Sequence, residues 1–138
     1  MKGLLTLATL IAFQLVPIAH GEEINHTFHC KIYASEGWQK CGFAQKGDLV
    51  KVIAHGSWKY GFFSASDANG GGGWGVLLAN CPSGALIASQ DFEHGVCYRK
   101  GMAFRALKSG SIYFRINDPD DELYNNSGYI EIEVEVSE

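Results

Sequence analysis

The 138-residue sequence is short of positive charge, with 11 Lys and Arg against 15 Asp and Glu and a formal net charge of −4. Because binding to DNA or RNA depends on neutralising closely spaced phosphates, this balance argues against nucleic acid as a partner. The sequence also lacks G-x-S-x-G and H-E-x-x-H, and neither Lys-Ser nor Lys-Thr follows its glycine run. These absences disfavour a serine hydrolase, a zinc protease and a phosphate-binding loop.

The first 21 residues have the pattern of an export signal. Lys2 supplies a positive start, Leu4–Val16 is mostly apolar, and Ala19-His20-Gly21 fits a cleavage site between small residues. The apolar run is too short to span a bilayer comfortably, so we expect a secreted protein without a transmembrane segment in the mature chain. Residues 22–138 are then long enough for a single domain with a modest core.

All four cysteines lie in the exported part: Cys30, Cys41, Cys81 and Cys97. An even number of cysteines in an oxidising compartment predicts two disulfides, for which three pairings are possible. We favour Cys30 with Cys41, because the two residues flank a turn at Ser35-Glu36 in what look like neighbouring antiparallel strands, and this choice leaves Cys81 with Cys97. A zinc site built from His26, His29, Cys30 and Cys41 is the competing interpretation, although paired C-x-x-C motifs are absent.

No convincing helical periodicity follows residue 21, and short strands separated by turn residues are indicated instead. In the clearest strand, Ile130, Ile132, Val134 and Val136 alternate with Tyr129 and three glutamates, which predicts one buried and one solvated face. The expected strands are Thr27–Ala34, Trp38–Ala44, Leu49–Trp58, Val76–Leu78, Ala85–Ser89, Met102–Ala106, Ser111–Asn117 and Tyr129–Val136. About eight strands in a domain of this size predict an all-β fold, a jelly-roll-like antiparallel β-sandwich.

The segment Asn117–Gly128, N-D-P-D-D-E-L-Y-N-N-S-G, is unusually rich in side-chain oxygens. They come from Asp118, Asp120, Asp121, Glu122, Asn125 and Asn126. Ca²⁺ prefers six to eight oxygen ligands, so a short loop held between two strands could supply part of a calcium site. The loop is not an EF-hand, because Leu123 and Tyr129 occupy the positions that require Gly and Glu. Further ligands would have to come from elsewhere in the chain, and the alternative is a solvated acidic turn.

The segment Phe62–Trp74 contains four consecutive glycines, Gly70–Gly73, which disfavour a regular helix or strand. One interpretation is a mobile binding loop that carries Asn69 and Trp74. The other is a slack linker whose Trp74 packs into the core.

Four segments in this order are similar to the PA-I type galactophilic lectin family. They are K-G-D-L-V-K-V-I-A-H-G-S-W-K-Y-G (Lys46–Gly61), G-A-L-I (Gly84–Ile87), S-G-S-I-Y-F-R-I-N-D (Ser109–Asp118) and N-N-S-G (Asn125–Gly128). The resemblance spans most of the chain from Trp38 to the C-terminus, and the distance from Asp118 to Asn125 matches the family loop without a gap.

The resemblance implies a jelly-roll-like sandwich that binds galactose through one Ca²⁺ per subunit. It assigns side-chain ligands to Asp118, Asn125 and Asn126 and main-chain carbonyl ligands to Tyr60 and Glu122. Such a set leaves the cation short of its preferred shell, so two neighbouring sugar hydroxyls can complete it. A shallow site of this kind binds one sugar weakly, so we expect a homo-oligomer that gains avidity.

The chain departs from the family in two respects. The family's His and Gln that grip the sugar's distal hydroxyl lie in a loop that does not align here, where the glycine-rich Phe62–Trp74 segment stands instead. The cysteines are a further addition.

The chain contains two N-glycosylation sequons, Asn25-His26-Thr27 and Asn125-Asn126-Ser127. A glycan on Asn125 would consume a calcium ligand, so we predict modification at Asn25 alone.

Three functions follow from these observations. The first is a secreted, calcium-dependent lectin that binds a galactose-like sugar through Tyr60, Asp118, Glu122 and Asn125, with Asn69 and Trp74 in further contact. The second is a structural or interaction module in which Ca²⁺ only braces the acidic loop. The third is a glycosidase that uses two carboxylates of this loop.

Overall fold

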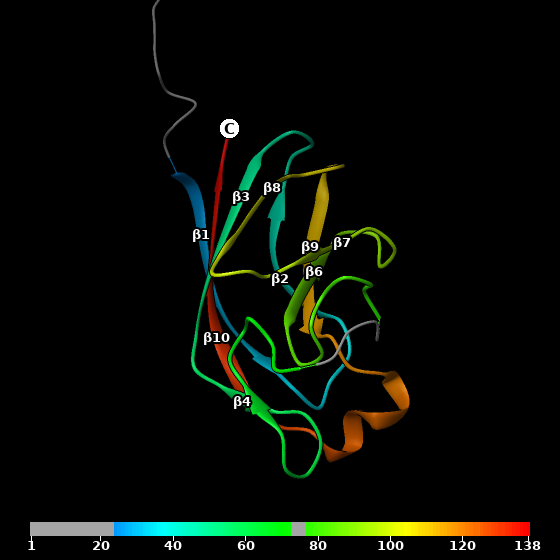
Figure 1. The fold of residues 1–138 in the computed structure, drawn as a ribbon. Coiled ribbons are helices and arrows are strands. Elements are labelled where there is room, and N and C mark those ends of the chain that lie inside the picture. The colour runs from blue at the N-terminus through cyan, green and yellow to red at the C-terminus, as the bar shows by residue number, and fades with distance from the viewer. Residues whose placement is uncertain (1–23, 73–76) are drawn as a thin grey trace, which may run out of the picture.

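The computed structural model describes residues 24–72 and 77–138 of the chain. These residues form two antiparallel β-sheets that face each other as a sandwich (Figure 1). The strands are β1 (Ile24–Tyr33), β2 (Gln39–Ala44), β3 (Leu49–His55), β4 (Trp58–Lys59), β5 (Ala65–Ser66), β6 (Leu86–Ser89), β7 (Gly95–Cys97), β8 (Met102–Arg105), β9 (Gly110–Ile116) and β10 (Ser127–Ser137). A short 3-10 helix, η3 (Asp120–Asn125), joins β9 to β10. The expected all-β sandwich is therefore confirmed.

Strand β10 organises the larger sheet. It pairs with β1 along one edge and with β3 and β4 along the other edge. Strand β5 pairs with β4, and β8 pairs with β3. Along β10, Ile130, Ile132, Val134 and Val136 are buried, while Glu131 is exposed. This is the alternation that the sequence predicted, and it places the apolar face against the second sheet. The smaller sheet has the order β2-β9-β6-β7.

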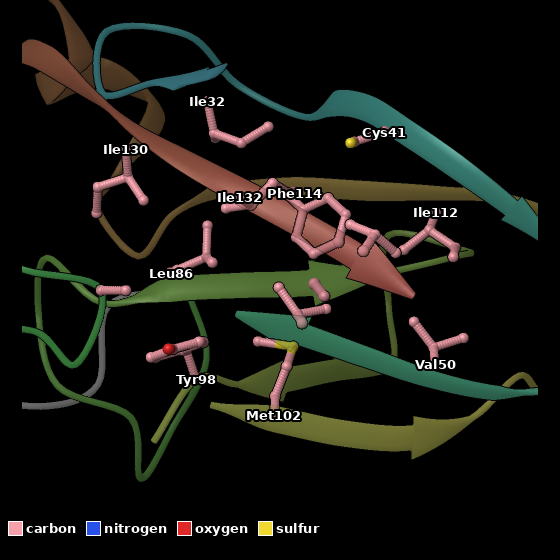
Figure 2. Packing of buried hydrophobic residues seen from close by; sticks show 14 of the residues in the cluster. Ile32, Cys41, Val50, Leu86, Tyr98, Met102, Ile112, Phe114, Ile130 and Ile132 are labelled. Atoms are coloured by element: carbon pink, nitrogen blue, oxygen red, sulfur yellow. The ribbon is translucent and has the colours of Figure 1, made fainter. Parts of the chain in front are cut away.

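The core lies between the two sheets and is built mainly from aliphatic side chains (Figure 2). Ile32, Val50 and Ile132 from the larger sheet share one cluster with Leu86 and Phe114 from the smaller sheet. Burial of these side chains stabilises each one by about 1.5–3 kcal/mol relative to exposure. A smaller cluster of Cys81, Ala85 and Ile87 has Trp38, Leu78 and Cys97 packed against it.

The expected strands differ from the observed ones in three places. The predicted strand Leu49–Trp58 is divided into β3 and β4, which both pair with β10, by a bend at Gly56, whose φ of +102° suits glycine. The two-residue β5 and three-residue β7 are too short to show a periodic pattern and were missed. The predicted strand at Val76–Leu78 is wrong for Leu77 and Leu78, which form a bend, and Val76 lies outside the described residues.

Both disulfides join the favoured pairs, Cys30 with Cys41 and Cys81 with Cys97, so the zinc interpretation is wrong. The first disulfide links β1 of the larger sheet to β2 of the smaller sheet, and the second fastens the segment before β6 to β7. Within the described parts of the chain, no helix has the length and hydrophobicity needed to cross a bilayer. The expected export signal lies outside those parts.

Candidate functional site

The acidic segment lies at one end of the sandwich, where β9 ends and the chain passes through η3 before β10 begins (Figure 1). The sequence predicted a short loop held between two strands, and the structure has a 3-10 helix here. The amide of Glu122 donates to the carbonyl of Pro119 and the amide of Asn126 to that of Leu123. The three acids in the first turn of η3, Asp120, Asp121 and Glu122, have exposed side chains.

Asp118 stands directly before η3 and is buried, with 6% of its surface exposed. Its Oδ2 accepts a hydrogen bond of 2.8 Å from Nδ2 of Asn126. Burial raises the pKa of the Asp118 carboxyl, although the Asn126 hydrogen bond and the Arg115 charge act in the opposite direction. Asp118 is thus a carboxylate whose negative charge the protein only partly compensates.

The Asn126 side chain connects three segments that are far apart in the sequence. Besides Asp118, its Nδ2 donates to the Ala34 carbonyl at the end of β1, at 3.0 Å. Its Oδ1 accepts from the Gly61 amide, at 2.8 Å, in the turn between β4 and β5. Gly61 follows Tyr60 directly, so this hydrogen bond brings the Tyr60 main chain to the acidic segment. Two residues of the expected ligand set, Asp118 and Asn126, are therefore in contact, with Tyr60 beside them.

Asn125 carries an oxygen without a partner. Among the described residues, its Oδ1 is a buried side-chain atom for which no hydrogen bond is formed. Leaving such an acceptor unsatisfied costs about 1–3 kcal/mol, and a cation would remove that cost. The donor set of a buried carboxylate and an unpaired amide oxygen therefore fits Ca²⁺, which takes oxygen ligands.

The glycine-rich segment packs against Tyr60. The amide of Gly72 donates to the Tyr60 hydroxyl at 3.2 Å. A Cβ at Gly71 would overlap the Tyr60 hydroxyl, and one at Gly70 would lie 2.7 Å from Pro82. Glycine is therefore required at these positions because larger side chains would displace the Tyr60 ring or its neighbours. Part of the segment thus has a defined packing role, which neither sequence interpretation included.

Of the other sequence-predicted residues, Asn69 and Glu122 lie in the part of the chain that the structure describes. Asn69 Oδ1 accepts from the amide of Lys100, between β7 and β8, so its contacts hold that connection. Trp74 lies outside the described residues. The Glu122 side chain is exposed, as a residue expected to contribute only its carbonyl can be.

Sequence reasoning missed two buried polar residues beside the site. Arg115 donates to the Asp118 carbonyl at 2.8 Å and to the Asp120 carboxylate at 2.6 Å. Asn117 Oδ1 accepts from the amides of Leu77 and Leu78. Asn117 Nδ2 also donates to the Cys81 and Pro82 carbonyls, at 3.0 and 3.1 Å. The available signal was a charged residue and an amide in the otherwise apolar end of a strand, F-R-I-N.

No protein-family model matches the chain, and no curated protein matches its sequence. Among solved structures, it is similar to a chain described as the EclA N-terminal domain, a PllA-like lectin, with a TM-score of 0.66. The match covers 80% of this chain and 96% of that chain, at 16% sequence identity. At this identity the comparison shows a shared fold.

Proposed function

We propose that the protein is a secreted lectin that binds galactose or a related sugar through Ca²⁺ held by the acidic segment. The observation that carries this proposal is the combination of the buried Asp118 carboxylate with the unpaired, buried Oδ1 of Asn125. The fold shared with a PllA-like lectin supports carbohydrate binding, and the two disulfides fit an oxidising compartment. We further propose a homo-oligomer, in which several weak sites act together.

Five residues would hold the ion. Asp118, Asn125 and Asn126 would contribute side-chain oxygens, and Tyr60 and Glu122 would contribute main-chain carbonyls. The Oδ1 of Asn126 already accepts from the Gly61 amide, which uses one of its two lone pairs and leaves the other. Because Asn126 also donates to Asp118, it positions the carboxylate while taking part in the ligand set.

Bound at this position, Ca²⁺ would offer open coordination positions to two neighbouring hydroxyls of a sugar. The Asp118 carboxylate can accept hydrogen bonds from those hydroxyls, and the amide of Asn125 can donate to them. The turn that carries Gly61 also presents Phe62, 67% exposed, and Phe63, 98% exposed. These rings offer an apolar surface next to the site for the less polar face of a bound sugar. Contact through Asn69 and Trp74 stays a prediction.

Isothermal titration with methyl β-D-galactopyranoside, in millimolar Ca²⁺ and in EDTA, tests the proposal. We expect a dissociation constant of roughly 10 µM to 1 mM with Ca²⁺, and loss of this Ca²⁺-dependent binding in EDTA. Asn125→Ala should abolish binding because it removes the unpaired oxygen. Ser127→Ala is the matched control, because it deletes the same sequon but leaves both asparagines intact. Absence of binding to any sugar of a glycan array in Ca²⁺ would refute the lectin proposal.

The exposed acids of η3 favour a second candidate, a module that Ca²⁺ braces without any sugar. Asp120, Asp121 and Glu122 lie side by side, and a divalent cation would relieve their mutual repulsion. A melting temperature that rises with Ca²⁺ while no glycan binds would select this function.

Glycoside hydrolysis is disfavoured because Asp120 is paired with Arg115 at 2.6 Å. Release of a chromogenic aglycone, lost in Asp120→Asn, would revive it.

A further inference from the structure

A cleft of about 240 Å³ lies on the outer face of the smaller sheet. Its walls include Trp38, from the segment before β2, and Phe92, from the turn between β6 and β7. Arg115 and Asp120 form the side nearest the acidic segment, and Glu93 lies on the Phe92 side. None of the five proposed calcium ligands lines this cleft.

Phe92 has an unusual backbone conformation, with φ of +67°. A bulky residue rarely adopts this left-handed region, and such residues are concentrated at functional sites. The turn holds Phe92 there, because the Phe92 amide donates to Ser89 Oγ at 2.9 Å and the Asp91 carboxylate accepts from the next two amides. Phe92 is nevertheless 52% exposed, so its burial in a core does not explain the conformation.

The strained turn places the Phe92 ring in an aromatic group. Its centroid lies 4.7 Å from that of Tyr113 and 5.6 Å from that of Trp38. Trp38 is partly buried and packs against the small cluster that contains Cys81 and Ile87, so its position is fixed from behind. Two positioned aromatic rings at an open cleft are suited to the apolar C–H face of a sugar ring.

Polar groups stand next to these rings. The Asp120 side chain is 77% exposed, and Arg115 holds its carboxylate in place. The Arg115 guanidinium also lies 5.8 Å from the Trp38 ring centroid, and its side chain is only 4% exposed. A carboxylate fixed beside aromatic rings can accept hydrogen bonds from hydroxyls. The second carboxylate, Glu93, disfavours an anionic ligand.

We propose that this cleft is a second glycan site, which binds one neutral pyranose unit without a metal. The aromatic rings of Trp38 and Phe92 would take the C–H face of the sugar, and the Asp120 carboxylate would accept from its hydroxyls. The cleft is slightly smaller than the range of about 300–1,000 Å³ usual for ligand pockets, so its size suits a single ring rather than a long chain.

The test is a glycan array probed with the full protein in EDTA, which removes any contribution from Ca²⁺. The wild type is expected to bind at least one neutral oligosaccharide. Phe92→Gly should weaken that binding by about tenfold or more, because an aromatic contact is lost. Glycine adopts a φ of +67° without strain, so the variant should keep or raise the melting temperature. Phe92→Tyr should bind like the wild type.

The outcomes separate this inference from the calcium proposal. Failure of the wild type to bind any glycan in EDTA overturns the second site, as does equal binding by Phe92→Gly. In that case, binding that appears only with Ca²⁺ would leave the calcium proposal intact. Conversely, EDTA-resistant binding that Phe92→Gly weakens supports the second site even if Ca²⁺ has no effect.

Discussion

The chain contains two acidic turns that look alike in the sequence and differ in the structure. One is the segment from Asp118 to Asn126, and the other is the turn Ser89–Gly95 between β6 and β7. In the second turn, Asp91, Glu93 and His94 bring potential ligand atoms within 4.8 Å of one another. By the spacing of its ligand atoms alone, this cluster resembles a metal site.

Hydrogen bonding distinguishes the two turns. Asp91 Oδ1 accepts from the amides of Glu93 and His94, at 2.9 and 2.8 Å, and its Oδ2 pairs with His94 Nδ1 at 2.6 Å. These contacts lower the pKa of Asp91, so its charge is compensated by its own turn. In the other segment, burial raises the pKa of Asp118, and Asn125 Oδ1 has no partner. The second turn thus compensates its carboxylate within itself, whereas the first segment leaves an oxygen that a cation could take.

The largest expected effect is on the response of the melting temperature to Ca²⁺. At a concentration about 100 times the dissociation constant, Ca²⁺ should stabilise the fold by about 2.7 kcal/mol. That corresponds to a shift of about 10 °C in a domain of this size. Asp118→Asn should abolish the shift, and Asp91→Asn should leave it unchanged, as differential scanning fluorimetry would measure.

The melting temperature of Asp118→Asn in EDTA tests the effect of the buried carboxylate on the metal-free protein. Because burial raises the pKa of Asp118, its ionised form opposes folding at neutral pH, and Asp118→Asn should melt at a higher temperature in EDTA. A Ca²⁺ shift that survives in Asp118→Asn, or disappears in Asp91→Asn, would reverse the assignment of the two turns.

Truncation of one residue in each turn should change the free energy of unfolding in different directions. In EDTA, Asp91→Ala leaves the Glu93 and His94 amides without their acceptor and should destabilise the protein. Asn125→Ala removes an oxygen that has no partner, so it should have no effect or stabilise by up to about 1 kcal/mol. Urea unfolding in EDTA measures both values. A loss of stability in Asn125→Ala equal to that in Asp91→Ala would show that Asn125 has a structural partner.

The sequence predicted those features of the fold that depend on local patterns. The alternation from Ile130 to Val136 predicted β10, and the spacing of Cys30 and Cys41 about a turn predicted their disulfide. The features that it did not predict depend on contacts between distant residues. Asn126 binds Gly61, 65 positions away, and Ala34, 92 positions away, and no periodic pattern records such a contact.

The same distinction applies to the candidate site. The resemblance to a lectin family supplied the proposed ligand set, but it did not indicate that Arg115 and Asn117 are buried beside it. Nor could composition separate the two acidic turns, because burial and hydrogen bonding, rather than the number of carboxylates, decide whether an oxygen is free to bind a cation.

The smallest expected effect is the titration of His94, which reports how completely the Ser89–Gly95 turn compensates its own charges. The Asp91 carboxylate raises the pKa of His94 above its ordinary value of 6.5. This interaction therefore stabilises the fold fully below that value, provided that Asp91 is ionised, and the stabilisation is lost as the pH rises through the raised pKa. Two-dimensional NMR of the imidazole should give a raised pKa in the wild type and a return towards 6.5 in Asp91→Asn. An unchanged pKa in that variant would mean that the Asp91–His94 pair does not form in solution, and the second turn would then have a carboxylate available for other ligands.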